Sequence, residues 1–165
     1  MFADFTPDFE FESVYDVDFD KFLTHGKKGI IFDIDNTLVA HDAPCNEKSD
    51  ALLRQLIQMG YKLFILSNNK EERVKIFIPN VYVDYIAKAD KPSGKNYEKA
   101  LSAMGLKKEE VIAVGDQLLT DCMGAKKMGI TFVKVGIISK NEPIHIRFKR
   151  FLEKIIEIFT KGNKR

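Results

Sequence analysis

Five short runs of apolar residues recur along the chain, and each gives way to polar or turn-forming residues. The runs are apolar throughout and do not alternate with polar residues, which is typical of parallel strands covered on both faces. They predict strands over residues 28–33, 61–66, 81–86, 111–114 and 130–135.

The segments between these runs predict helices over residues 47–59, 70–77, 93–104 and 120–128. Gly60, Gly105 and Gly129 follow three of them, and glycine just past a helix is the expected stop signal. Because strand and helix alternate, the predicted fold is an α/β three-layer sandwich with a central parallel five-stranded sheet. We expect one domain over residues 1–165.

Polar residues follow four of the five runs. They are Asp33 and Asp35, then Ser67 to Asn69, then Lys91, and then Asp116 with Asp121. Open α/β sheets place their ligand sites at the carboxyl ends of the strands, so we expect these side chains to meet there. Two carboxylates about 4 Å apart repel by about 4 kcal/mol in a partly buried setting. A divalent metal and a phosphate ester are the natural partners for such a site.

The same residues carry a family resemblance over residues 7–139. The motifs are Tyr15-Asp16, Asp33 to Val39, Ser67 to Lys70 with Arg73-Val74, Lys91-Pro92, and Gly115 to Asp121. In them the chain resembles the haloacid dehalogenase (HAD) superfamily of phosphohydrolases. It is most similar to the capless subfamily IIIA and, within it, to a YqeG-type group related to phosphatidylglycerophosphate phosphatases. The resemblance implies the HAD-like Rossmannoid fold without a cap domain.

The resemblance also implies a role for each of these residues in phosphoryl transfer. In this reaction the protein mainly positions the reactants and neutralises charge. Asp33 is the candidate nucleophile and would form an aspartyl-phosphate. Asp35 would act as general acid toward the leaving oxygen and then as base toward water. Ser67 and the amide of Asn68 would bind phosphoryl oxygens, and Lys91 would supply a positive charge.

By the same resemblance, Mg²⁺ is the expected cofactor. Asp33, the backbone carbonyl of Asp35 and Asp116 would hold it, with Asp121 as a direct or indirect partner. An all-oxygen set of this kind suits Mg²⁺, which shares its site with water and substrate phosphate.

Each candidate also has a simpler interpretation. The first two aspartates could be turn residues, and Ser67 to Asn69 could cap a helix. Lys88 or Lys95 could stand in place of Lys91, and Asp116 or Asp121 could serve only the following helix. The histidines, at positions 25, 41 and 145, show no ligand spacing, so we expect them to be exposed.

The spacing of the motifs leaves no room for a cap domain. The 31 residues 36–66 hold one loop, one helix and one strand, and 23 residues separate Ser67 from Lys91. We therefore expect an open site, unless an oligomer closes it. An open site suits a substrate whose bulk stays outside, such as a lipid headgroup, a polymer end or a protein side chain.

The two ends of the chain differ in charge. Residues 1–20 carry seven acids and no lysine or arginine, whereas residues 144–165 carry seven lysines and arginines against two glutamates. The acidic, aromatic segment 1–26 could cover the sheet, dock on the tail or form an arm before Pro7. Residues 143–165 predict a basic amphipathic helix whose apolar positions are Phe148, Phe151, Leu152, Ile155, Ile156, Ile158 and Phe159. That face could pack on the protein's own sheet or lie at a membrane surface.

Other features limit the function classes. Two cysteines, Cys45 and Cys122, offer no disulfide framework, which fits a reducing compartment. With no leader and no apolar run long enough to span a bilayer, we expect a cytoplasmic protein whose membrane contact, at the inner face, is peripheral. Neither a phosphate-binding glycine loop nor a nucleic-acid motif is present, so we expect no nucleic-acid partner.

Three functions remain. The leading one is a Mg²⁺-dependent phosphatase of phosphatidylglycerophosphate at the membrane surface. The second applies the same chemistry to a soluble sugar or nucleotide phosphate, with oligomer contacts in place of a cap. The third is a non-catalytic regulatory module that kept the fold.

Overall fold

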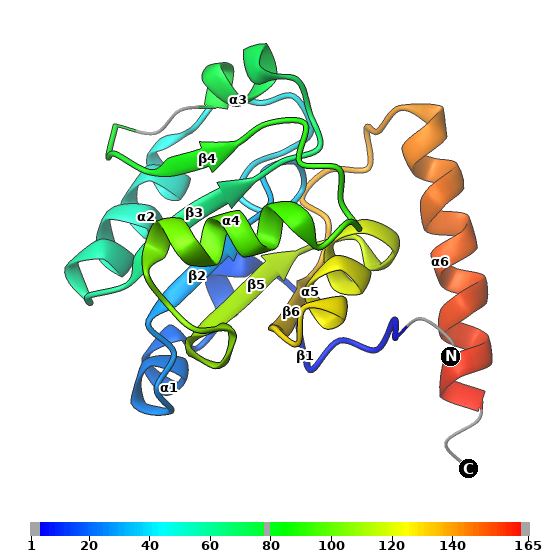
Figure 1. Cartoon of the computed structure of the whole chain (residues 1–165). Coiled ribbons are helices and arrows are strands. Elements are labelled where there is room, and N and C mark those ends of the chain that lie inside the picture. The colour runs from blue at the N-terminus through cyan, green and yellow to red at the C-terminus, as the bar shows by residue number, and fades with distance from the viewer. Residues whose placement is uncertain (1–3, 78–79, 163–165) are drawn as a thin grey trace.

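The computed structural model describes residues 4–77 and 80–162, and it shows six strands and six α-helices within them (Figure 1). The strands are β1 (Phe9–Phe11), β2 (Gly29–Phe32), β3 (Lys62–Leu66), β4 (Asp84–Ile86), β5 (Val111–Gly115) and β6 (Thr131–Val135). The helices are α1 (Phe19–Thr24), α2 (Glu47–Gln58), α3 (Glu71–Phe77), α4 (Lys95–Met104), α5 (Met123–Lys127) and α6 (Ile144–Gly162). Shorter helical turns cover Val14–Asp16, Lys108–Glu110 and Leu118–Cys122.

All strand pairs are parallel, and the sheet order is β1-β6-β5-β2-β3-β4. Every residue of β2 is buried, because this strand lies between β5 and β3 and is covered on both faces. In Figure 1 the arrowheads of β3, β4 and β5 point toward the side on which α6 stands. The chain order thus brings the carboxyl ends of β2, β3 and β5 to one edge.

Two hydrophobic clusters form the two sides of the sandwich. One packs α1, α2 and α3 on the sheet, with Phe19, Leu53 and Phe77 fully or almost fully buried. The other packs α4 and α5 on the opposite face around Tyr97 and Phe132. The predicted three-layer α/β fold is therefore confirmed, and the described residues include no cap domain.

The prediction of five strands was one strand short. β1 comes from the acidic segment and pairs with β6, with Phe9 opposite Val133. Its three residues are too few to show a pattern, and it is held by the backbone of β6. Farther along, Val14, Val17 and Phe22 are buried in the core, so the segment covers the sheet, one of the three arrangements the sequence left open.

The predicted helix 120–128 also begins differently. A π-helical turn at Leu118–Cys122 precedes α5 and starts only two residues after Asp116. Such turns are rare and occur frequently at functional sites. Here the turn places Asp121 within reach of the strand end.

α6 stands beside the sandwich (Figure 1). Its polar side faces inward. Glu153 is buried and accepts a hydrogen bond from the Leu119 N–H at 3.1 Å, and Glu157 pairs with Lys134 at 2.5 Å. The outer side carries an apolar stripe. The stripe consists of Ile144, Phe148, Phe151, Leu152, Ile155, Ile158 and Phe159, all of them exposed. Ile156, which the sequence placed on the same face, is half-buried. The other six predicted apolar positions do not pack on the protein's own sheet, which was one of the two arrangements left open.

Candidate active site

The turn after β2 gives the side chains of Asp33 and Asp35 different surroundings. Asp33 continues the strand, since its N–H donates to the Val114 carbonyl at 3.0 Å. Three residues later the chain folds back, with Asn36 in the left-handed region (φ 58°) and its N–H bonded to the Val39 carbonyl. As a result, the carboxylates of Asp33 and Asp35 meet different partners.

Lys91 links the ends of β2 and β3 with the π-helical turn that follows β5. Its Nζ lies 2.9 Å from Asp33 Oδ1, 2.6 Å from Asp121 Oδ1 and 2.8 Å from the Leu66 carbonyl oxygen. Lys88 and Lys95, the sequence alternatives to Lys91, are exposed. Burial alone would lower the pKa of Lys91, but Asp121 and Asp33 raise it well above its usual range, so the amine stays charged.

Asp33, Asp116 and Asp121 form a three-carboxylate cluster, in which one oxygen of each carboxylate lies within 4.8 Å of the other two. Burial raises the pKa of Asp33 to about 6, against the opposing effect of Lys91. Burial, together with Asp33 and Asp121, also raises the pKa of Asp116 well above its usual range. Hard oxygen ligands crowded in this way fit a divalent cation such as Mg²⁺, which would relieve their mutual repulsion.

Two further contacts fix this cluster. Gly115 permits the approach of Asp121, because a Cβ at position 115 would lie 2.5 Å from Asp121 Oδ2. Asp116 accepts hydrogen bonds from Thr37 Oγ1 at 3.3 Å and from Arg150 Nη2 at 2.5 Å. Arg150 also pairs with Glu142, so α6 is tied to the cluster by an ion pair.

Asp35 lies in a different environment. Its Oδ1 accepts hydrogen bonds from Arg73 Nη2 at 2.8 Å and from the Asp42 N–H at 2.8 Å. Its Oδ2 accepts one from Asn69 Nδ2 at 2.5 Å, and His41 Nδ1 is 4.0 Å from Oδ1. The Asp35 carboxylate therefore stands apart from the three-carboxylate cluster, and a role for its backbone carbonyl as a metal ligand stays a prediction.

Ser67 and Asn68 connect the loops after β3 and β4. Ser67 is fully buried, and its Oγ accepts a hydrogen bond from the Asn69 N–H at 3.2 Å. The Asn68 side chain accepts from the Lys91 N–H at 2.7 Å and donates to the Lys91 carbonyl at 3.0 Å. Asn68 thereby holds Lys91 in place, and the phosphate contacts expected of Ser67 and Asn68 stay predictions.

A cleft of about 220 Å³ opens above these residues. Its lining includes Asp33, Asp35, Asn68, Asn69 and Lys91, with His41, Gln117 and Thr120, and with His145, Ile146 and Lys149 of α6. A larger hollow of about 600 Å³ beside α2 shares no residue with it. The first two turns of α6 therefore form one wall of a site that we expected to be open.

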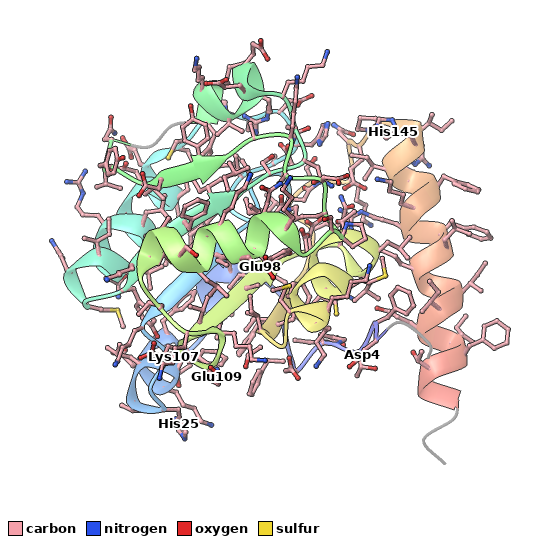
Figure 2. The ribbon with its side chains drawn as sticks, viewed as in Figure 1. Asp4, His25, Glu98, Lys107, Glu109 and His145 are labelled. Carbon is pink, nitrogen blue, oxygen red and sulfur yellow. The ribbon has the colours of Figure 1, made fainter. Side chains whose placement is uncertain are left out.

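The sequence reasoning gave no role in the site to several of these residues. Arg73 and His41 both contact Asp35, and His41 is only 12% exposed in its side chain, contrary to our expectation for the histidines. His145, in contrast, is exposed as expected, although it borders the cleft where α6 begins (Figure 2). Arg73 stands four residues after Asn69, one helical turn away, which was an available signal. Nothing in the local sequence indicated Arg150.

Known proteins show the same fold and family. A model of haloacid dehalogenase-like hydrolases matches residues 40–135. The "Probable phosphatase YqeG" of Bacillus subtilis is 36% identical over 153 residues, which cover 92% of this chain and 89% of that protein. The chain belongs to the haloacid dehalogenase-like hydrolases. The resemblance seen in the motifs is confirmed, and the chain is an enzyme of the HAD phosphatase type.

Two solved structures support the fold. The core domain of a putative phosphoglycolate phosphatase from Streptococcus pneumoniae is 17% identical with a TM-score of 0.52, covering 77% of this chain and 96% of that one. A putative HAD subfamily IIIA hydrolase from Legionella pneumophila is 16% identical with a TM-score of 0.50, covering 70% and 69%. At these identities the likeness concerns the fold alone.

Proposed function

We propose that this protein is a Mg²⁺-dependent phosphomonoester hydrolase that works through an aspartyl-phosphate on Asp33. The observation that carries the proposal is the position of Asp33 at the cleft floor, beside Lys91 and the other two carboxylates of the cluster. These groups have the types and spacing that in-line phosphoryl transfer requires. A non-catalytic module would have no use for a buried group of three acids and a lysine.

In the first step an Asp33 oxygen would attack phosphorus, forming the Asp33–phosphate bond as the bond to the leaving oxygen breaks. Lys91 already binds Oδ1 of Asp33, which leaves Oδ2 to attack. Asp35 would give a proton to the leaving oxygen and then accept one from the water that hydrolyses the aspartyl-phosphate. Arg73, Asn69 and the Asp42 N–H all donate to Asp35 and so hold its carboxyl group in place.

The local charges argue for a cation in the cluster. Lys91 and Arg150 bring two positive charges to three carboxylates, and a phosphate would add further negative charge. When bound, a divalent metal would neutralise the charge that develops on the transferring oxygens. Asp33, Asp116 and Asp121 would hold it, with the Asp35 carbonyl as the family resemblance implies.

We further propose phosphatidylglycerophosphate at a membrane surface as the substrate. Among the described residues no helix combines the length and apolarity needed to cross a bilayer. The apolar stripe of α6, in contrast, is suited to lie on one. Phe148 is 60% exposed and Phe159 74%, and the exposed Arg147 and Lys154 border the stripe. Rings project from α6 on the side away from the sandwich in Figure 2.

This layout is that of an interfacial helix, in which apolar side chains enter the acyl boundary and basic ones meet anionic lipid. Each basic residue near the surface contributes about 1 kcal/mol. Because the same helix forms a wall of the cleft, a lipid phosphate at the bilayer surface would lie close to the site.

A soluble sugar or nucleotide phosphate is the second candidate substrate. The apolar stripe also favours this candidate if a second copy of the chain, and not a membrane, covers it. Two copies of the chain could bury the stripe between them, and the sequence analysis left open that oligomer contacts stand in for a cap. Binding to vesicles of anionic lipid separates these arrangements. Lipid docking predicts that Phe151→Ser weakens vesicle binding, whereas pairing predicts that it shifts the protein from dimer to monomer.

The test of the proposal is phosphate release with Mg²⁺ from phosphatidylglycerophosphate in mixed micelles, beside soluble sugar and nucleotide phosphates and an Asp33→Asn control. We expect release from the lipid that is lost in the control. Release only from soluble esters would keep the chemistry and overturn the lipid substrate. No release from any phosphate ester would overturn both.

A further inference from the structure

Lys149 lies on the wall of the cleft that α6 provides, three positions after Ile146, which shares the lining. The side chain is half-buried, on the side of the helix that faces the sandwich. Lys149 therefore belongs to the site and not to the apolar stripe, which occupies the opposite side of α6.

One other lysine and two arginines near the cleft form ion pairs with protein carboxylates. Lys91 pairs with Asp33 and Asp121, Arg73 with Asp35, and Arg150 with Asp116. For Lys149, within residues 4–77 and 80–162, the structure shows neither an ion pair nor a side-chain hydrogen bond. Lys149 is thus a half-buried lysine beside the cleft, and no protein carboxylate pairs with it in the described residues. Its ammonium group is therefore available to bind an anionic group of the substrate.

We assign Lys149 to an anion other than the reacting phosphoryl group. The reacting group must reach Asp33 at the cleft floor, where Lys91 and the proposed metal meet its charge. Lys149 comes from α6, on a different element from Asp33 and Lys91, so we expect the group it meets to be a second anionic group of the substrate. The cleft, at about 220 Å³, is smaller than the pockets that enclose drug-sized ligands, so it has room for a headgroup and not for acyl chains.

We propose that Lys149 binds a second phosphate of the substrate, of the phosphodiester class, and so selects phosphomonoesters that carry such a group nearby. The inference rests on the proposed phosphomonoesterase function and narrows its substrate class. His145, one turn earlier on the same wall, borders the same space. The diester could belong to a lipid headgroup or to a soluble molecule, and Lys149 would bind either.

The experiment compares three substrates under saturating Mg²⁺. They are glycerol 3-phosphate, deacylated phosphatidylglycerophosphate, and phosphatidylglycerophosphate in mixed micelles. The first has only the monoester, the second adds the diester, and the third adds the acyl chains. The variants are Lys149→Ala and, as a charge-matched control, Lys140→Ala, an exposed lysine outside the cleft lining. Alanine is a good helix former, so the first change should preserve α6.

We expect Lys149→Ala to raise KM about tenfold for both diester-bearing substrates, the loss of one charge-assisted hydrogen bond, with kcat nearly unchanged. Glycerol 3-phosphate should show no change, and Lys140→Ala should leave all three unaffected. An effect on the micellar lipid alone would assign Lys149 to membrane attraction and overturn the diester site.

An equal effect on all three substrates, or none, would overturn the inference while phosphatase activity stood. If the wild-type protein hydrolysed none of the three, the proposed function would fail first, and the inference with it. The two failures are therefore distinguishable from the wild-type rates alone.

Discussion

Asp33 and Asp35 are two residues apart, yet the structure gives them opposite surroundings. Asp33 shares a buried cluster with two more carboxylates and one lysine, and burial raises its pKa to about 6. Asp35 accepts hydrogen bonds from an arginine, an asparagine and a backbone N–H. The sharp turn at Asn36 creates this difference. One short motif can thus supply two chemical roles, because environment and not residue type decides what a carboxylate does.

The largest effect should come from Asp33→Asn. An amide is too weak a nucleophile to form the covalent intermediate, so we expect kcat to fall by about 10⁴-fold or more. Phosphate release measures the loss, and a thermal unfolding curve checks that the variant still folds. Near wild-type turnover in a folded variant would remove Asp33 from the nucleophilic role.

Asp35→Asn should slow both half-reactions, by about 10²–10⁴-fold, because proton transfer is lost to the leaving oxygen and from water. A substrate with a very acidic leaving group needs no protonation in the first step. Rapid-quench kinetics with that substrate should therefore show near-normal phosphorylation followed by slow hydrolysis. Unchanged rates in both steps would contradict the acid/base assignment and the contrast with Asp33.

Arg73→Met tests the other side of the comparison. It leaves the buried Asp35 without its counter-ion, and breaking a buried pair costs about 3–5 kcal/mol of unfolding free energy. The matched control is Arg54→Met, which breaks the Asp50–Arg54 pair whose arginine is 53% exposed, and should cost about 0.5 kcal/mol or less. Urea denaturation measures both. Equal costs would mean that Asp35 does not depend on Arg73.

The smallest effect concerns pH. The folded-state pKa of Asp33 lies above its ordinary value of 3.8, so the metal-free folded protein binds more protons than the unfolded chain between about 4 and 6. Its contribution to stability is therefore present below that window and is lost as the pH rises through it. Bound protons also exclude the metal, so we expect Mg²⁺ affinity to rise as the pH increases through about 6.

Calorimetric titration of Mg²⁺ at several pH values checks this expectation, with Asp33→Asn as the comparison. In that variant the pH dependence between about 4 and 6 should weaken, because the titrating carboxyl is gone. An affinity independent of pH in the wild type would contradict the shared burial of the three carboxylates.

The sequence predicted the parts of the site that depend on strand ends. Asp33, Lys91 and Asp116 each follow an apolar run, and parallel strands bring such positions to one edge. Arg73 belongs to one of the quoted motifs, but its ion pair with Asp35 depends on the turn at Asn36. Arg150 reaches Asp116 from 34 residues away, and a helical pattern does not say which side of a helix packs.

α6 is the clearest case in which the helical pattern does not predict the side of the helix that packs on the protein. Its apolar side predicts burial on the sheet by the ordinary rule for amphipathic helices. In the structure Glu153 and Arg150 face inward instead, held by the Leu119 N–H and by the Asp116 carboxylate. Three-residue β1 was missed for a related reason, since its partner and not its own sequence holds it in the sheet.

The most direct measurement is to trap the intermediate. The protein is mixed with Mg²⁺ and a phosphomonoester with an acidic leaving group, quenched in acid within one turnover, and digested for mass spectrometry. We predict one phosphoryl group on the peptide that contains Asp33, located at Asp33 itself and absent from Asp33→Asn. A phosphoryl group on any other residue, or turnover with no phosphorylated protein at any time, would contradict the account.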